Sequence, residues 1–461
     1  MVFLHTLYYK TLNFSRKAYQ SLLAWKQRST RKPLLLRGAR QVGKTTLVTM
    51  FATEFTVFLT VNLEREEDRA IFERTDSVKD ILNAIYLLKE VSPKPGSTLL
   101  FIDEIQESPK AIQLLRYFYE EMPELYVIAA GSLLEFSLKE VPSFPVGRIE
   151  YLCLHPLDFE EYLIALEYKM AAEQLSQVPV AEFAHATLLK LFHEYAIIGG
   201  MPEVVQLYAQ TKNIASIKPV YERLWYSYKD DVEKYAKNNT ERNVIRHIID
   251  TAAHEQDRIK FEKFGKSSYR SREVGEAMRT LEMAKVIQLI YPTTSLQPPI
   301  ITDFKKRPRL QLLDTGLLNH ALGLQGEMIG IKDLSDFYRG KVIQHVVTQQ
   351  LIAIHENPSY KPHFWVRESK DANSEVDLVF QQNQYVVPIE VKSGEQGRLR
   401  SLHQFVERSN HPYAVRLFAN QLKVEKSVTP AGKEYLLLNL PYYLANKLLH
   451  YIQWFVENHK L

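Results

Sequence analysis

Several features that define whole classes of protein are scarce in this sequence or missing from it. Its 461 residues include one cysteine, Cys153, which excludes an intrachain disulfide and a zinc site built from a cysteine cluster. No apolar run is long enough to span a membrane, and the amino terminus has no long apolar stretch of the kind found in signal peptides. We therefore expect a cytoplasmic protein with no membrane among its partners.

The sequence is also close to electrical balance. Its 58 basic and 54 acidic residues leave a formal charge of +4, too small a surplus to indicate a nucleic-acid partner by itself. Neither a repeat of fixed period nor a low-complexity tract is present. A chain of this length exceeds what one hydrophobic core usually supports, so we expect roughly two to four domains.

A phosphate-binding loop is predicted near the amino terminus. A short apolar strand over 34–37 leads directly into Gly38-x4-Gly43-Lys44-Thr45, and an apolar helix follows. The glycines allow backbone N–H groups to face phosphates, Lys44 adds a full charge, and the Thr45 hydroxyl suits Mg²⁺. We expect ATP and Mg²⁺ as ligands, with the nucleotide bound by Gly38, Ala39, Arg40, Gln41, Val42, Gly43, Lys44, Thr45 and Thr46.

Two acidic residues end the next strongly apolar strand. In TLLFIDEIQ the strand over 98–102 delivers Asp103 and Glu104 at its carboxyl end. We predict that Asp103 holds Mg²⁺, through water, and that Glu104 polarises the water that attacks the γ-phosphate. The alternative for Asp103 is a helix N-cap. Further apolar strands in FTVFLTVNLE and LYVIAAGSLLEF, separated by helical stretches, predict a parallel sheet with helices on both faces.

Five stretches carry a resemblance to a known group of proteins: RKPLLLRGARQVGKTTLV, LLFIDEIQ, VIAAGSLLEF, VGRIEYLCLHPLDFEEYL and YAIIGGMPEVV. Together they resemble the prokaryotic AAA-type ATPases that are fused to a carboxy-terminal, nuclease-like domain of unknown function. The resemblance implies that Ser132 senses the γ-phosphate, for which a Gly-Ser turn is the alternative. It implies an arginine-finger or sensor role for Arg148, for which a surface salt bridge is the alternative. Because an arginine finger can act from a neighbouring subunit, a homo-oligomer is compatible with the sequence.

Four domains are predicted, in an α/β chain. The P-loop AAA-type ATPase core with its parallel sheet occupies 1–155, and a helical lid, 156–215, shows apolar residues at three- and four-residue spacings. A winged-helix-like domain covers 216–330, and a small α/β restriction-endonuclease-like domain covers 331–461. The stretch GGMP, 199–202, is interpreted as a helix end.

Basic residues cluster in the winged-helix-like part. Between Arg258 and Arg272 they alternate with aromatic residues, and a second group, KKRPR, occupies 305–309. This pattern fits the phosphate backbone of DNA. A solvated surface or a contact with the ATPase domain explains the same charges. The members of the first cluster are Arg258, Lys260, Lys263, Lys266, Arg270 and Arg272.

A charged hairpin is predicted from SEVDLVFQQNQYVVPIEVKSG, 374–394. Alternation along its two strands brings Asp377, Glu390 and Lys392 to one polar spot. Two carboxylates can hold Mg²⁺ and a lysine can help to activate water at a phosphodiester. The order Asp-x12-Glu-x-Lys resembles the core of restriction-endonuclease-like proteins. A proline, Pro388, predicts a sheet edge or a bulge nearby.

One residue argues against nuclease activity. The related pattern carries a glutamate on the preceding helix at the place of Gln344, and a neutral amide is a poorer ligand for Mg²⁺ than a carboxylate. Glu375, on the same face as Asp377, partly compensates for the missing acid. The sequence therefore predicts a nuclease-like domain whose chemistry is weakened or lost.

Two functions remain open from the sequence. In the first, ATP hydrolysis by Lys44, Thr45, Asp103, Glu104 and Ser132 drives a DNA-binding, nuclease-like module. In the second, ATP gates a signalling or assembly switch that binds a protein partner and cuts no DNA. DNA-stimulated ATP turnover distinguishes the first from the second.

Overall fold

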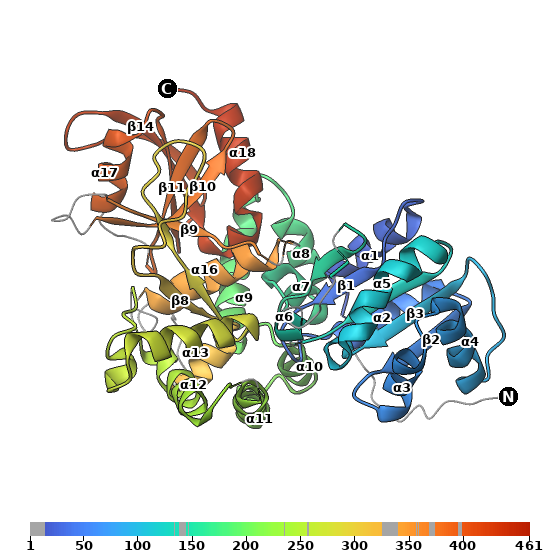
Figure 1. Ribbon diagram of the computed structural model, residues 1–461. Helices are drawn as coiled ribbons and strands as arrows, with labels where there is room; N and C mark the ends of the chain where they lie inside the picture. Colours follow the sequence, from blue (N-terminus) through green and yellow to red (C-terminus); the bar gives the residue numbers. More distant parts are fainter. Residues whose placement is uncertain are drawn as a thin grey trace.

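The computed structural model describes residues 14–132, 134–137, 144–145, 147–234, 236–255, 258–324, 340–355, 357, 359–367, 374–394 and 399–461. Figure 1 shows two lobes: a smaller one from the amino-terminal third, in blue and cyan, and a larger one from the rest of the chain. The domain boundary predicted after residue 330 lies outside the described residues.

The smaller lobe is built on a parallel sheet of five strands in the order β2-β3-β4-β1-β5. All six residues of β3 are buried, as expected for a strand covered on both faces. Leu100 and Ile102 pack with helices α3, α4 and α5, while Leu99 and Phe101 pack with α1 and α2 on the opposite face. The strands are β1 (Leu34–Arg37), β2 (Val57–Asn62), β3 (Thr98–Asp103), β4 (Tyr126–Ala130) and β5 (Glu150–Cys153), and the helices are α1 (Lys17–Gln27), α2 (Lys44–Phe51), α3 (Glu66–Arg74), α4 (Val78–Leu88), α5 (Pro109–Glu121) and α6 (Leu134–Ser137).

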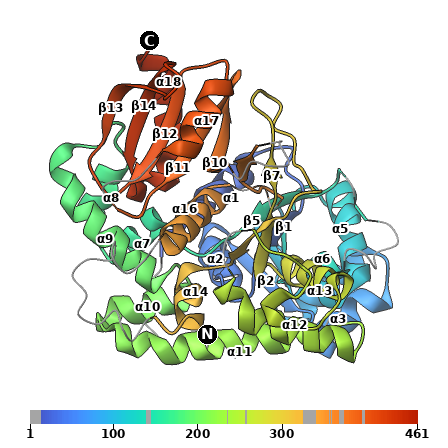
Figure 2. The ribbon, with the colours of Figure 1, turned by 90° about the vertical axis from the view of Figure 1, so that its left-hand side faces the viewer.

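A helical segment follows the sheet and joins the two lobes. Its helices α7 to α10 share one continuous apolar core with the middle of the chain and with the carboxy-terminal sheet. Helix α11 runs along the lower edge of the molecule in Figure 2. The helices are α7 (Phe159–Ala165), α8 (Lys169–Leu175), α9 (His185–Ile198), α10 (Pro202–Thr211), α11 (Ile214–Glu233), α12 (Asn239–Thr251), α13 (Ser271–Met283) and α14 (Thr315–Ala321).

A two-stranded antiparallel sheet lies beyond α13. It pairs β6 (Ile287–Ile290) with β8 (Arg309–Leu312), so that Ile290 lies opposite Arg309. Arg258 forms an isolated antiparallel bridge with Arg309 on the same strand. The basic group KKRPR therefore leads into β8, and its last member begins that strand.

The larger lobe ends in a mixed sheet of seven strands in the order β13-β14-β12-β11-β10-β9-β7. Of the two alternatives predicted from Pro388, a sheet edge or a bulge nearby, the structure has the bulge, because β11 pairs with β10 on one side and β12 on the other. The irregularity falls on β10, where the register with β9 shifts between Val376 and Val379, around Asp377. The elements are β7 (Pro292–Thr293), α16 (Lys341–Ala353), β9 (His363–Val366), β10 (Glu375–Gln382), β11 (Tyr385–Val391), α17 (Arg400–Arg408), β12 (Tyr413–Phe418), β13 (Lys423–Val428), β14 (Glu434–Pro441) and α18 (Leu448–Asn458).

Among the described residues, none of the helices combines the length and the apolar character that crossing a membrane requires.

Candidate functional site

The phosphate-binding loop connects β1 to α2 and takes backbone conformations that its sequence suits. Gly43 has a φ of 92° and Gln41 a φ of 63°, both in the left-handed region. A β-carbon on Gly38 would lie 2.3 Å from the carbonyl oxygen of Leu154, so a larger residue has no room there. These constraints explain why glycine occupies the first position of the motif.

Lys44 is buried at the start of α2, and its ammonium group points back into the loop. The Nζ atom donates hydrogen bonds to the carbonyl oxygens of Gly38 at 3.1 Å and Ala39 at 2.9 Å. Burial lowers the pKa of Lys44 to about 8, while the carboxylates of Glu104 and Asp103 act in the opposite direction. A bound anion would favour the charged form of this lysine.

The predicted magnesium residues are in direct contact. Thr45 Oγ1 donates a hydrogen bond to Asp103 Oδ2 at 2.9 Å, and burial raises the pKa of Asp103. Glu104 follows with a left-handed φ of 52°, and its carboxylate accepts a hydrogen bond from Gln106 Nε2 at 2.6 Å. The sequence analysis did not identify Gln106 as a site residue. Its position two residues after Glu104 was the one indication in the sequence.

One cavity of about 410 Å³ joins these groups. Lys44, Thr45, Glu104 and Ser132 all line it. Ser132 reaches it because β4, which ends just before it, lies between β1 and β3 in the sheet. The volume of this cavity is in the range found for sites that bind small molecules. The other lining residues are Phe14, Arg16, Arg40, Gln41, Gly43, Thr46, Leu47, Met50, Pro202, Glu203 and Gln206.

Part of this cavity comes from residues that the sequence did not identify. Pro202, Glu203 and Gln206 are on α10. Pro202 is the last residue of the stretch that was interpreted only as a helix end, and the other two follow it. Arg16 donates a hydrogen bond to the carbonyl oxygen of Val42 at 3.1 Å and forms an ion pair with Glu161 at 3.1 Å. Pro202 at the first turn of a helix after two glycines was the one local signal.

Helix α11 contacts the phosphate-binding loop from the larger lobe. Arg40 forms an ion pair with Asp231, and the hydroxyl of Tyr228 donates a hydrogen bond to the carbonyl oxygen of Arg40 at 2.8 Å. Asp231 and Tyr228 are both buried. The conformation of the loop is therefore connected to a helix outside the ATPase sheet.

Arg148 forms a surface ion pair. Its Nε atom is 2.8 Å from Oε1 of Glu120 on α5, and the Arg148 side chain is 45% exposed. It is not among the described residues that line the cavity beside Lys44 in its own chain. An arginine-finger role toward a neighbouring subunit stays a prediction.

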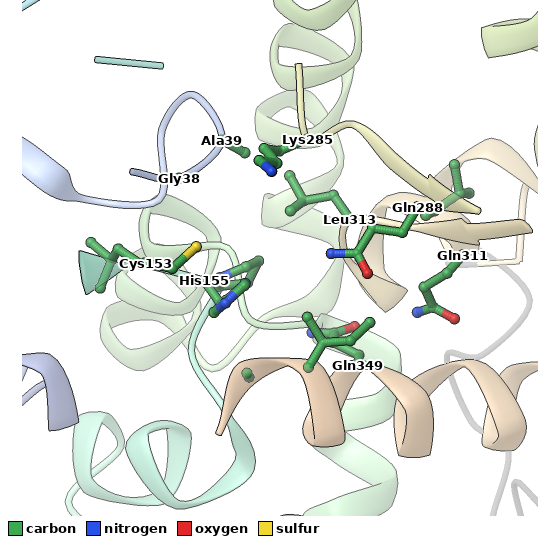
Figure 3. A pocket seen from close by; sticks show the side chains of 14 residues that line it. Gly38, Ala39, Cys153, His155, Lys285, Gln288, Gln311, Leu313 and Gln349 are labelled. Carbon is green, nitrogen blue, oxygen red and sulfur yellow. The ribbon is translucent and has the colours of Figure 1, made fainter. Parts of the chain in front are cut away.

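A second, smaller cavity of about 30 Å³ lies where the lobes meet. Figure 3 shows this cavity, which is lined by Gly38 and Ala39 of the phosphate-binding loop and by Lys285 and Gln349 from the larger lobe. His155 also lines it, and burial lowers the pKa of this histidine to about 4. The phosphate-binding loop and α16 therefore line the same small cavity.

The predicted nuclease-like residues do lie close together, but each carboxylate has protein partners. Asp377 Oδ1 accepts from Gln344 Nε2 at 2.9 Å, and Oδ2 accepts from the backbone N–H of Val391 at 2.9 Å. Glu390 Oε1 pairs with Lys392 at 2.6 Å. Burial, and then the Asp377 carboxylate, raise the pKa of Glu390 to about 7.

Two arginines from outside the sheet add to this cluster. Arg309 pairs with both Glu375 and Asp377, and Arg258 pairs with Glu375 at 3.0 Å. Arg258 is thereby engaged with the carboxy-terminal sheet. The other basic residues of its segment, Lys260, Lys263, Lys266, Arg270 and Arg272, are exposed, while the interleaved Phe264 is buried in the core.

A metal ion fits one of the two predicted sites. At the nucleotide cavity, a threonine hydroxyl and a carboxylate in contact form an oxygen donor set of the kind that Mg²⁺ takes. At Asp377 the guanidinium group of Arg309 lies 3.3 Å from Oδ1 and also pairs with Glu375. A cation of the chain is therefore already in contact with these carboxylates, and the residues present do not fit a divalent cation. Across the described ranges, no group of three or more His, Cys, Asp or Glu side chains is arranged to hold a metal.

Three parts of the chain match known protein families. Residues 30–163 match the family described as AAA domain. Residues 189–328 and 339–441 match two families described as domains of unknown function, DUF8612 and DUF4143. No curated protein matches the chain.

Two solved structures are similar to it at low sequence identity. The Walker-type ATPase PABY2304 of Pyrococcus abyssi is 15% identical, with a TM-score of 0.44, over 67% of this chain and 96% of that one. PCH-2 of C. elegans is 12% identical, with a TM-score of 0.27, over 43% of this chain and 62% of that one. The parallel sheet, its phosphate-binding loop and the match to the AAA domain over residues 30–163 agree: the amino-terminal part of this chain has the α/β fold of P-loop ATPases.

Proposed function

We propose that the chain binds ATP and hydrolyses it to ADP and phosphate with Mg²⁺. The observation that carries the proposal is that Lys44, Thr45, Glu104 and Ser132 line one cavity, while Thr45 contacts Asp103. Lys44 is buried, and within the described part of the chain its ammonium group donates hydrogen bonds to two carbonyl oxygens of the loop. A triphosphate supplies the anionic oxygens that such a lysine lacks.

Each residue has a separate task in this proposal. Lys44 binds phosphate oxygens, Ser132 donates its hydroxyl to the γ-phosphate, and Glu104 orients and polarises the attacking water. Thr45 and Asp103 would hold Mg²⁺. When bound, the metal neutralises charge on the phosphates. Phe14 and Pro202 also line the cavity, and they offer apolar surface to the base of the nucleotide.

A chain of contacts supports coupling between nucleotide and the larger lobe. Gly200, two residues before Pro202, donates its N–H to Asp314 Oδ2 at 2.7 Å. Gln349 of α16 donates to the same oxygen at 3.1 Å. Helix α16 also carries Gln344, which binds Asp377 on β10. A shift of α10 on nucleotide binding would therefore act on the carboxy-terminal sheet through α16.

The first use proposed for this coupling is a DNA-binding, nuclease-like module. The predicted division into an ATPase core (1–155), a lid (156–215), a winged-helix-like part (216–330) and a restriction-endonuclease-like part (331–461) belongs to this proposal. Helices α12 and α13 with the β6–β8 pair support the third part, and the order α16, β9, β10, β11, α17 supports the fourth. The exposed lysine and arginine side chains between Lys260 and Arg272 provide a surface for the phosphate backbone of DNA.

The second use is a switch that binds a protein partner without cutting DNA. The observation that favours it is that Asp377 and Glu375 are both occupied by arginines of the same chain. Such a cluster holds domains together and performs no hydrolysis. The outer surface and the oligomeric state would then be what nucleotide controls.

Steady-state ATP hydrolysis with and without duplex DNA tests these alternatives. We expect the wild-type protein to hydrolyse ATP. Glu104→Gln should bind ATP but fail to hydrolyse it, and Glu107→Gln should hydrolyse ATP at the wild-type rate. Glu107 is the matched control because it is an exposed glutamate three residues further along the chain. Normal hydrolysis by Glu104→Gln would show that the base has been misassigned. Stimulation by DNA supports the first use, and slow, DNA-indifferent turnover supports the switch.

A further inference from the structure

The Asp377 cluster is a built site for a cation, and its occupant is already part of the chain. Arg309 uses its whole guanidinium group there. Nε donates to Glu375 Oε1 at 2.8 Å, one terminal nitrogen donates to the carbonyl oxygen of Asp377 at 2.9 Å, and the other contacts Glu375 Oε1 and lies 3.3 Å from Asp377 Oδ1. A planar ion with donors in fixed directions matches this set of acceptors better than a lysine would.

The position of Arg309 is fixed by its backbone and by an aromatic ring. Its guanidinium carbon lies 4.4 Å from the centre of the Phe364 ring on β9. Arg309 pairs with Ile290 in the β6–β8 sheet and bridges to Arg258, and Ile259 donates its N–H to the Pro308 carbonyl at 2.8 Å. Arg309 therefore lies on a strand that is hydrogen-bonded to β6 on one side and held by the segment around Arg258 on the other.

Two arginines neutralise the carboxylates of Glu375 and Asp377. Arg258 pairs with Glu375, and Arg309 pairs with both. Lys392 pairs with Glu390. A divalent cation at Asp377 would have to displace Arg309 and leave that guanidinium, which is only 17% exposed, without its acceptors.

We infer that Arg309 is the resident cation of the Asp377 site and excludes divalent metal from it. The predicted nuclease-like cluster is then an arginine-binding site that fastens the β6–β8 sheet to β10 of the carboxy-terminal sheet. The neutral Gln344 fits this role, because its amide N–H donates to Asp377, which a glutamate could not do.

Manganese binding by the full-length chain tests the inference, with free Mn²⁺ measured by electron paramagnetic resonance in the absence of nucleotide. Every protein carries Asp103→Asn, so that the nucleotide site contributes no signal. We expect Arg309→Met to gain one Mn²⁺ site, with affinity on the order of tenfold or more above the Arg309-containing parent. Adding Asp377→Asn to Arg309→Met should remove the gained site.

Arg307→Met is the matched control. Arg307 is an exposed arginine two residues before Arg309, and it lines the same surface pocket as Arg309 and Asp377. It should bind no more Mn²⁺ than the parent. A second arm does not depend on the folding of Arg309→Met: Asp377→Asn alone should leave Mn²⁺ binding unchanged. Loss of a Mn²⁺ site in Asp377→Asn alone, or the absence of any gain in a folded Arg309→Met, overturns the inference without touching the ATPase proposal.

Discussion

The carboxylate of Asp314 accepts a hydrogen bond from the backbone N–H of Gly200 at 2.7 Å, which joins the start of α14 to the loop that leads into the nucleotide cavity. Asp314 is completely buried and also caps α14 through the N–H groups of Gly316 and Leu317. Gln349 of α16 donates to it at 3.1 Å. One side chain therefore connects three segments that are far apart in the sequence.

Replacing Asp314 by alanine should destabilise the protein and weaken ATP binding together. The substitution leaves several buried donors without an acceptor, so we expect the free energy of unfolding to fall by about 3 kcal/mol. ATP affinity should fall because Gly200 no longer fixes the approach of α10 to the cavity. Thermal unfolding and nucleotide titration measure the two effects.

The control for this prediction is Asp250→Ala. Asp250 forms an ion pair with Lys229, but its side chain is 54% exposed. Its removal should cost less than about 1 kcal/mol and leave ATP affinity unchanged. An Asp314→Ala protein of normal ATP affinity would contradict the proposed link between α14 and the cavity.

ATP affinity should depend on pH through Lys44. Burial lowers the pKa of this lysine to about 8, so the nucleotide-free protein loses the ammonium charge above that pH. Bound phosphates favour the charged form, so ATP affinity should fall with rising pH, approaching about tenfold per unit. Titrations with excess Mg²⁺ between about pH 7 and pH 9.5 measure this slope. Lys44→Arg should show a flat profile whatever its absolute affinity, because arginine does not titrate in this range.

Local motifs allowed much of the nucleotide site to be predicted, because its chemistry is contained in short stretches. The strand, Gly38, Gly43 and Lys44 follow one another, and Asp103 ends its own strand. The sequence could not predict which distant surface touches these residues. Arg40 forms an ion pair with Asp231, which is 191 residues further along the chain. The packing of the two lobes determines this contact.

The carboxylate cluster shows the same limit. Alternation along two strands correctly placed Asp377, Glu390 and Lys392 near one another. The occupation of the cluster by Arg309 depends on β8, which comes 68 residues before Asp377 and belongs to another sheet. For the basic group at 305–309 the sequence left open a DNA contact, a solvated surface and a contact with the ATPase domain. Its last arginine faces carboxylates of the carboxy-terminal sheet.

Gln106 should act on hydrolysis by positioning Glu104. Its amide donates to Glu104 at 2.6 Å, and a β-carbon on Gly131 would lie 2.4 Å from Gln106 Oε1. We expect both Gln106→Leu and Gly131→Ala to lower kcat on the order of tenfold with little change in KM. Equal losses in kcat and in ATP binding would instead indicate general damage to the site. Glu107→Gln serves again as the control for substitutions in this turn.

Arg148→Ala separates the two roles considered for Arg148. Its contact with Glu120 is exposed to solvent, so its removal should leave the stability of the protein nearly unchanged. A surface ion pair predicts unchanged turnover at every protein concentration. An arginine finger predicts that kcat falls strongly, and that wild-type specific activity rises with protein concentration as subunits associate. Turnover measured over a dilution series decides between them.

Glu390 should make the stability of the protein depend on pH. Burial and the neighbouring Asp377 raise the pKa of Glu390 from 4.5 to about 7. Between these values the folded protein holds a proton that the unfolded chain has released, so the free energy of unfolding falls as the pH rises through this window. The penalty is complete above about pH 7.

Glu390→Gln should remove this dependence. The amide stays neutral and its oxygen still accepts a hydrogen bond from Lys392, so the variant gains stability relative to wild type as the pH rises, by up to about 3 kcal/mol. Urea unfolding at several pH values between about 4.5 and 8 measures the difference between the two curves. Glu434→Gln, at an exposed position of β14, should run parallel to wild type throughout. If Glu390→Gln also ran parallel to wild type, Glu390 would be ionised in the folded protein, and its charge would have to be stabilised by Lys392 more strongly than burial opposes it.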